Sequence, residues 1–292
     1  MDVKRVIKLG GSYYVALPKE WVRANRLEGG YVIVEAEGGG VLRLRTLGSL
    51  GAEEKPRARV SCKGDVLRGV LSAYLKGYEV IEVSVEDSCR ERALREISRA
   101  QSLLVGLELV EESDRELVLH CFIRDDYSVE SLLSRMNAVS LTMLERAARA
   151  LSTGDEALVK EVHVLDDRVD RLYFLAVRLI RSKVASPLTP PEYRVRLVDL
   201  RLAARNIEDL ADTYEGLAAL APSIRCELVG VDLIAEAQRL IVKAIIEGGG
   251  RGEAGELLGR ARLALAEAEL PLPVKERMAR VLDLLDDTAD LV

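Results

Sequence analysis

Acidic side chains recur at helical spacing in two segments of the 292-residue chain. Both segments place their charged residues at i and then three and seven positions later, and the two sets are His163, Asp166 and Asp170, and Arg205, Glu208 and Asp212. Residues at this spacing share one face of a helix. Carboxylates at i and i+4 repel each other by about 0.2–0.5 kcal/mol per pair, and a bound multivalent cation would reverse that cost. Oxygen ligands suit magnesium, manganese or iron, and His163 favours a transition metal such as iron or zinc.

The alternative for these acids is an ordinary solvated helix face. Asp167 and Arg171 stand at i and i+4, where we expect an ion pair, and Arg205 could pair with Glu208. Enzymatic motifs do not occur in the sequence: it has no Glu-x-x-His pair of di-iron proteins, no glycine-rich phosphate loop ending in Lys-Ser or Lys-Thr, and no G-x-S-x-G elbow. We therefore expect a divalent or trivalent metal ion (iron, Mn, Mg or Zn) in a protein that is not an enzyme.

Periodic apolar residues predict helices throughout the chain from about residue 127. The predicted helices span residues 129–151, 155–184, 191–220, 228–247, 255–269 and 274–291, with glycine or proline at the breaks. This pattern predicts two three-helix bundles, 127–221 and 222–292. The pattern Arg-x-x-acid-x-x-x-Asp-Thr occurs on the third helix of each, and Asp283 and Asp287 carry it in the second.

Residues 51–126 alternate between strand and helix patterns and predict an α/β unit. Strands are expected at 57–62, 79–85, 107–111 and 116–122, and helices at 66–75 and 89–105. No catalytic constellation occurs in this segment, so a linker, a dimerisation element and a small-ligand sensor all remain open.

The N-terminal segment predicts two strand hairpins around a short helix, with strands at 6–9, 13–17, 31–36 and 41–45 and a helix at 19–25. About 45 residues bury little core alone, so we expect dimerisation. Residues 1–50 hold eight Lys and Arg against five Asp and Glu, whereas the whole chain has a net charge of −6. This distribution disfavours non-specific coating of nucleic acid but allows local DNA contact by the basic segment.

Four cysteines, Cys62, Cys89, Cys121 and Cys226, lie too far apart in sequence for a CxxC pair, which excludes a zinc ribbon of that type. We expect thiols in a reducing cytosol. Five Asn and Gln residues among many charges resemble a thermophile's composition, which leaves an intracellular disulfide open. No stretch reaches the roughly 18 apolar residues of a spanning helix, and the N-terminus has no signal-peptide core, so we expect a cytoplasmic protein without membrane insertion.

The stretch KLGGSYYVALPKEWVRANRLEGGYVIVEAEGGGVLRLR resembles the SpoVT/AbrB swapped-hairpin domain. The matching positions are Val15, Leu17, Pro18, Lys19, Leu27 and Gly30. The resemblance implies two interleaved chains that form one barrel with a basic, DNA-binding face. Candidate contacts to DNA phosphates are Lys4, Arg5, Lys8, Arg23, Arg43 and Arg45.

The stretches VLDDRVDRL and RLAARNIEDLADTYEGLA resemble the two acidic motifs of the PhoU family. That resemblance implies tandem three-helix bundles that bind metal clusters and restrain phosphate uptake and its signalling. Asp166, Asp170, Glu208 and Asp212 would be metal ligands in the first bundle. In the second bundle, alanines 264 and 268 stand opposite Asp166 and Asp170, so we expect one metal site per chain.

The predicted fold is multidomain: a small β swapped-hairpin barrel (1–50), a central α/β unit (51–126) and a mostly α, PhoU-like pair of three-helix bundles (127–221 and 222–292). The predicted function is a phosphate-responsive transcriptional regulator of phosphate uptake, a homodimer through the N-terminal domain that binds DNA there. The alternative is a non-DNA-binding adaptor that restrains a phosphate transporter or a sensor kinase and uses the hairpins only to dimerise.

Overall fold

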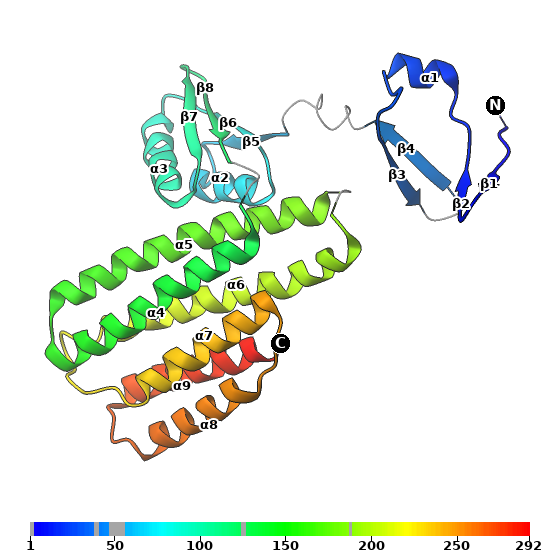
Figure 1. Ribbon diagram of the computed structural model, residues 1–292. Coiled ribbons are helices and arrows are strands. Elements are labelled where there is room, and N and C mark those ends of the chain that lie inside the picture. Colours follow the sequence, from blue (N-terminus) through cyan, green and yellow to red (C-terminus); the bar gives the residue numbers. More distant parts are fainter. Residues whose placement is uncertain (1–2, 38–40, 47–55, 124–126, 187–188) are drawn as a thin grey trace. The chain divides into compact units, whose positions relative to one another are not determined.

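The computed structural model describes residues 3–37, 41–46, 56–123, 127–186 and 189–292, and the side chains at 35–37, 43 and 45 lie outside that description. The chain divides into two compact units, residues 1–55 and 56–292 (Figure 1). None of the described helices combines the length and the apolar character needed to cross a membrane.

The N-terminal unit consists of two hairpins and one short helix. Its elements are β1 (Ile7–Leu9), β2 (Ser12–Tyr14), α1 (Lys19–Ala24), β3 (Val32–Glu37) and β4 (Val41–Thr46). β1 pairs with β2 and β3 with β4, both antiparallel, and these described strands form two separate sheets. The predicted hairpins are therefore present, while the predicted barrel stays a prediction.

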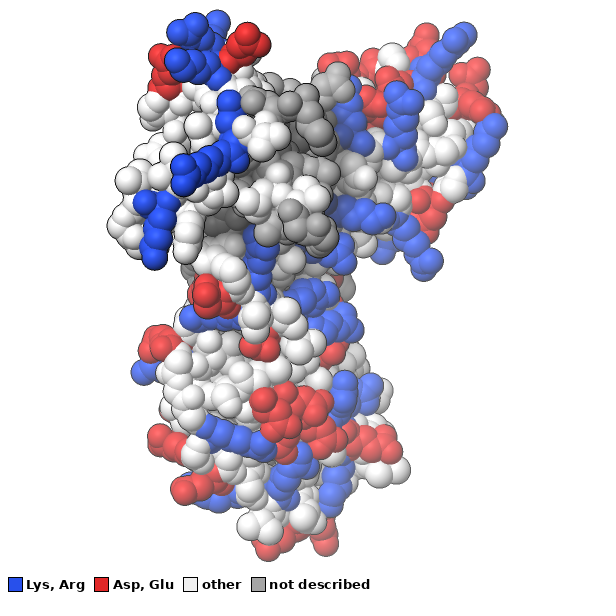
Figure 2. Space-filling view, turned by 90° about the vertical axis from the view of Figure 1, so that its right-hand side faces the viewer, with Lys and Arg blue, Asp and Glu red and all other residues white. Residues whose placement is uncertain are grey.

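Apolar side chains of this unit remain largely in solvent. Ile33 is the buried one among its described side chains, whereas Leu9 and Tyr13 are 61% and 71% exposed. The face of this unit that is visible in Figure 2 is largely uncharged, with separate Lys and Arg side chains across it and Asp and Glu side chains at its top. A hydrophobic surface of this kind in a unit of about 50 residues is typical of a segment completed by another chain.

The following segment is an α/β layer with one mixed sheet. Its elements are β5 (Arg57–Ser61), α2 (Val66–Leu75), β6 (Val80–Ser84), α3 (Arg90–Leu103), β7 (Leu107–Glu112) and β8 (Glu116–Cys121). The strand order is β5-β6-β8-β7, with β5 parallel to β6 and the other pairs antiparallel. α2 and α3 bury their apolar faces in a core with the sheet, for example through Tyr74, Ile81 and Ile97.

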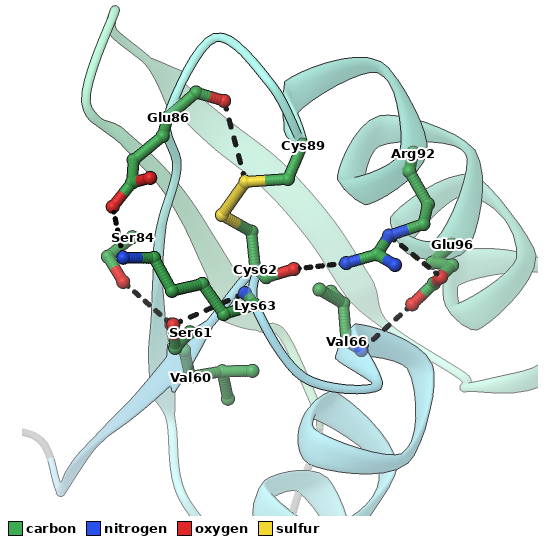
Figure 3. Close-up of a disulfide and its surroundings, with 10 residues drawn as sticks. All are labelled: Val60, Ser61, Cys62, Lys63, Val66, Ser84, Glu86, Cys89, Arg92 and Glu96. Atoms are coloured by element: carbon green, nitrogen blue, oxygen red, sulfur yellow. Dashed lines mark hydrogen bonds and ion pairs between the residues drawn. A yellow bond between two sulfur atoms is a disulfide. The ribbon is translucent and has the colours of Figure 1, made fainter.

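A disulfide joins Cys62 to Cys89 in this layer (Figure 3). The expectation of free thiols is therefore wrong for these two residues and holds for Cys121 and Cys226. The reason is tertiary: parallel pairing places Ser61 opposite Ser84, so the segments that leave β5 and β6 run side by side and bring the two Cα atoms to 5.9 Å.

Six helices occupy the described part of the chain from residue 129. They are α4 (Val129–Thr153), α5 (Glu156–Ala185), α6 (Pro191–Ala218), α7 (Val231–Glu247), α8 (Gly252–Glu267) and α9 (Leu272–Ala289). The side chains of Ser128 and Asp155 cap the starts of α4 and α5, and Gly154 ends α4 in a left-handed conformation. A mostly helical C-terminal part is thus confirmed.

The six helices pack as two groups around one continuous core. The first helical group is α4–α6 and the second helical group is α7–α9; α4 contacts α7 and α6 contacts α9 between them (Figure 1). A buried polar network also joins the groups: Gln238 of α7 bonds Asn137 and Ser140 of α4 at 2.8 and 2.7 Å and accepts from Tyr214 of α6 at 2.7 Å.

Arg178 of α5 fastens the α/β layer to the first helical group. Its guanidinium is buried, lies over the Tyr74 ring and donates to the carbonyl oxygens of Tyr74, Gly77 and Tyr78 at 2.6, 3.3 and 2.9 Å. These carbonyls lie at and just beyond the C-terminal end of α2, where the helix dipole favours a positive charge. The buried arginine is thereby compensated without a carboxylate.

Candidate metal centre

α5 and α6 carry the predicted acidic stripes and place them against each other in the first helical group. Carboxylate oxygens of Asp170, Glu208 and Asp212 all lie within 4.8 Å of one another. Glu208 is buried, Asp170 is half-buried and Asp212 faces solvent, so the cluster opens outward from the helix interface. Three of the four predicted acidic ligands are thus brought together, and we call them the carboxylate triad. Asp166 lies one helical turn from Asp170 on α5.

Burial and mutual repulsion raise the pKa of every one of these carboxyl groups. Burial is the larger cause for Asp166 and Asp170, and it raises their pKa values to about 7 and about 6. The next causes are the charges of Glu215 for Asp166 and of Asp212 for Asp170. Burial likewise raises the pKa of Glu208 and Asp212, followed by the charge of a neighbouring aspartate. The carboxylates therefore repel one another strongly when all are ionised.

Two buried carboxylate oxygens in this region lack a hydrogen-bond donor, Oδ1 of Asp166 and Oε2 of Glu208. Arg205 Nη1 lies 3.1 Å from that Glu208 oxygen without hydrogen-bond geometry, and it donates a long hydrogen bond of 3.5 Å to the other oxygen, Oε1. The same guanidinium also contacts Asp209 at 2.7 Å. One shared arginine does not balance the nearby acids, and buried acceptors without donors are destabilising.

Oxygen atoms that converge, repel and lack donors form a suitable environment for a cation. Mono- or bidentate carboxylates are the ligands that Mg²⁺ and Mn²⁺ take in proteins, and iron also accepts them. Asp170, Glu208 and Asp212 would hold such an ion directly, and Asp166, with its unpartnered oxygen, lies one helical turn away on α5. The residues present thus fit a hard cation.

His163, the fifth predicted ligand, lies elsewhere on the same helix. Its Nδ1 is 2.6 Å from Oε1 of Glu215, and this hydrogen bond raises the pKa of the imidazole. The histidine is exposed and is absent from the carboxylate triad. Its contact with Glu215 adds a residue that the sequence reasoning missed, although Glu215 follows Glu208 and Asp212 at seven and three positions on one stripe.

The second helical group treats its acids differently. Asp283, which matches Glu208 in the repeated motif, accepts from Arg262 of α8 at 2.9 Å, and the same guanidinium bonds Asp286. Arg251 pairs with Asp286 and Asp290. Among the described residues of this group no cluster of metal-ligand type occurs.

The comparison with protein families is decisive for the first helical group: the family model for the PhoU domain matches residues 133–221. Residues 133–221 are therefore a PhoU domain. The match runs from within α4 to the end of α6, so the PhoU domain contains the whole carboxylate triad together with Asp166. No curated protein and no solved structure matches the chain.

The PhoU domain match is shorter than the resemblance predicted, since it does not extend to the second helical group. It also leaves residues 1–132 unassigned, so the SpoVT/AbrB resemblance of the N-terminal unit remains a prediction.

The predicted DNA-contacting residues all belong to the N-terminal unit. Lys4, Arg5, Lys8 and Arg23 are exposed, with Lys8 lying over the Tyr13 ring at 5.9 Å. Arg43 and Arg45 lie in β4, but their side chains are outside the described residues. Their role in DNA binding is untested by the structure.

Proposed function

We infer from the PhoU domain that this chain has a role in the regulation of phosphate homeostasis. We propose that this chain is a cytoplasmic, phosphate-responsive transcriptional regulator of phosphate uptake. In this proposal a divalent or trivalent cation (Mg, Mn, iron or Zn) occupies the carboxylate triad, and the N-terminal unit dimerises and binds DNA. The observation that carries the proposal is the convergence of Asp170, Glu208 and Asp212 inside the PhoU domain.

The cation would neutralise the facing stripes of α5 and α6. Without it, burial favours protonated carboxyl groups, because their pKa values are raised. With it, the ionised forms are stabilised and the two helices can remain packed at neutral pH. Binding of a cation to the carboxylate triad would therefore stabilise the packing of α5 against α6.

Dimerisation through the N-terminal unit is supported by its exposed apolar side chains. Leu9, Tyr13 and Tyr31 are more than half exposed, and two small hairpins cannot bury them within one chain. A second copy would cover them, as the swapped-hairpin resemblance implies. The dimer would also double the excess of basic residues in this segment.

DNA binding is tested by fluorescence anisotropy with the full-length chain over a salt series. We expect log K to fall steeply with log[salt], and the combined change Arg5→Gln, Lys8→Gln and Arg23→Gln to flatten that slope by about 0.9 per lost phosphate contact. A matched control changes three exposed basic residues of the other unit, Arg99→Gln, Lys160→Gln and Arg280→Gln, and should leave the slope unchanged.

The leading alternative is an adaptor that restrains a phosphate transporter or a sensor kinase and uses the hairpins only to dimerise. It shares the PhoU domain and the carboxylate triad and differs only at the N-terminal unit. Absence of DNA affinity near 50 mM salt, where phosphate contacts hold, with the dimer intact by analytical ultracentrifugation, would favour the adaptor.

A further inference from the structure

A pocket of about 410 Å³ lies on the side of α5 away from the carboxylate triad. Arg135 of α4 and Arg168 and Arg171 of α5 contribute its charged lining. Its apolar lining includes Val105, which follows α3, Val139 of α4 and Leu172 of α5. The α/β layer and the PhoU domain thus both contribute to its wall. The volume is in the range of pockets that bind small ligands.

The three arginines of this pocket have no counter-charge among the described residues. No described carboxylate lies within ion-pair distance of Arg135, Arg168 or Arg171, and none lines the pocket. The ion pair expected between Asp167 and Arg171 does not form, although both side chains are exposed. Three guanidinium groups that gather around one pocket repel one another unless an anion lies between them.

Two other arginines of α5 have a structural role, because they form hydrogen bonds within the fold. Arg178 and Arg181 donate to main-chain carbonyls of α2 and the segment after it, so their hydrogen-bonding capacity is used within the fold. Arg168 and Arg171 make no such bonds in the described chain. Their exposed guanidinium groups are therefore open to a ligand.

The guanidinium group binds phosphate oxygens in pairs of parallel hydrogen bonds, which favours phosphate over simpler anions. Three guanidinium groups therefore match a compound with two or three linked phosphates better than they match a single phosphate. Val105, Val139 and Leu172 supply an apolar surface beside them for a non-polar ligand portion.

We propose that this arginine pocket binds a compound with two or more linked phosphates. The apolar wall favours a nucleoside di- or triphosphate over inorganic polyphosphate. The pocket is distinct from the proposed metal site: with 3.6 residues per turn, Arg168 is about 200° around α5 from Asp166. α5 therefore holds a polyphosphate on the side lined by α4 and a cation on the side lined by α6.

Isothermal titration calorimetry with the full-length protein in EDTA tests this proposal. The ligands are ATP, ADP, tripolyphosphate and orthophosphate, and EDTA removes any bridging through the carboxylate triad. We expect ATP and ADP to bind, with orthophosphate at least tenfold weaker. Arg168→Gln and Arg171→Gln should each weaken ATP binding about tenfold or more, as expected for loss of a charge-assisted bond.

Three further variants test the source of the phosphates and the effect of charge. Val139→Ser should weaken ATP but not tripolyphosphate, whereas Arg149→Gln, an exposed arginine of α4 outside the pocket, should change neither. Arg171→Lys keeps the charge but loses the planar fork and should weaken ATP less than Arg171→Gln. Thermal unfolding midpoints equal to wild type verify that each variant is folded.

Undiminished ATP affinity in both Arg168→Gln and Arg171→Gln would overturn the proposal, as would the absence of binding by all four ligands. Tripolyphosphate binding as tightly as ATP, with no effect of Val139→Ser, would overturn the preference for a nucleotide.

Discussion

The two helical groups carry the same acidic motif on their third helices, α6 and α9, and place it in opposite electrostatic settings. In the first group Glu208 faces Asp170 of the neighbouring helix. In the second group Asp283, at the matching motif position, faces Arg262. Alanines take the positions that correspond to Asp166 and Asp170. The acidic motif on the third helix therefore does not define a cation site by itself. A cluster of carboxylates also needs an acidic residue, and not an arginine, on the neighbouring helix.

The largest expected effect is stabilisation of the protein by a divalent cation. Mn²⁺ or Mg²⁺ at about 100 times its Kd should stabilise the wild type by about 2.7 kcal/mol, seen as a rise in Tm by scanning calorimetry. Asp170→Asn should abolish this rise and, by removing one repelling charge, increase the Tm of the metal-free protein.

Asp283→Asn provides the matched control in the second group. It should leave the metal-induced rise intact and slightly lower the Tm, because it removes a partner of Arg262. Equal metal stabilisation of the wild type and Asp170→Asn would contradict the assignment of the cation to the carboxylate triad.

The next effect is the pH dependence of stability in the metal-free protein. The pKa values of Asp166 and Asp170 rise from 3.8 to about 7 and about 6 on folding, so the folded state binds more protons than the unfolded state between these values. The contribution of these two groups to the free energy of unfolding is therefore greatest below about pH 4 and is lost as pH rises towards 8. His163 acts in the same direction, since Glu215 raises its pKa.

The expected loss is on the order of 2 kcal/mol after allowing for partial exposure of these groups. Urea unfolding at pH 5 and pH 8 measures it, and the double variant Asp166→Asn, Asp170→Asn should flatten the profile. Saturating Mn²⁺ should also reduce the loss, because it stabilises the ionised carboxylates. An unchanged profile in the double variant would show that these acids do not titrate as their environment indicates.

The smallest effect concerns the arginine that neutralises the second group. Arg262→Ala leaves Asp283 and Asp286 without this partner. Because the pairs are partly exposed, we expect a loss of about 1 kcal/mol in the free energy of unfolding. The variant should gain no metal-dependent rise in Tm beyond that of the wild type, since no second helix supplies facing carboxylates. A new metal response would show that two aspartates on α9 suffice for a site.

Local sequence signals predicted those parts of the fold that depend on neighbouring residues. The apolar periodicity and Gly77 predict the helix at 66–75, and the structure has it at the same residues, with the Asp65 side chain as its N-terminal cap. The acidic stripes of α5 and α6 follow from the sequence because a helix places residues at i, i+3 and i+7 on one face.

Features that depend on tertiary contacts were missed. The Cys62–Cys89 disulfide requires the parallel register of β5 and β6, which a separation of 27 residues does not reveal. The sequence does not show which face of α5 packs against α4. The absence of the Asp167–Arg171 ion pair and the presence of the arginine pocket both depend on that packing. His163 is predicted as a ligand because it shares the stripe of Asp166 and Asp170, and its actual partner, Glu215, lies 52 residues away in sequence.

The network around Gln238 has a consequence for how the helices can move. Its amide joins α7 to α4 through Asn137 and Ser140 and to α6 through Tyr214, all within the core. Sliding α7 by one helical turn, about 5.4 Å, would strand these polar groups in a non-polar interior at a cost of about 1–3 kcal/mol each. Gln238 thus fixes the register of α7 against α4 and α6. The three helices can move together as a unit, but α7 cannot slide along its neighbours.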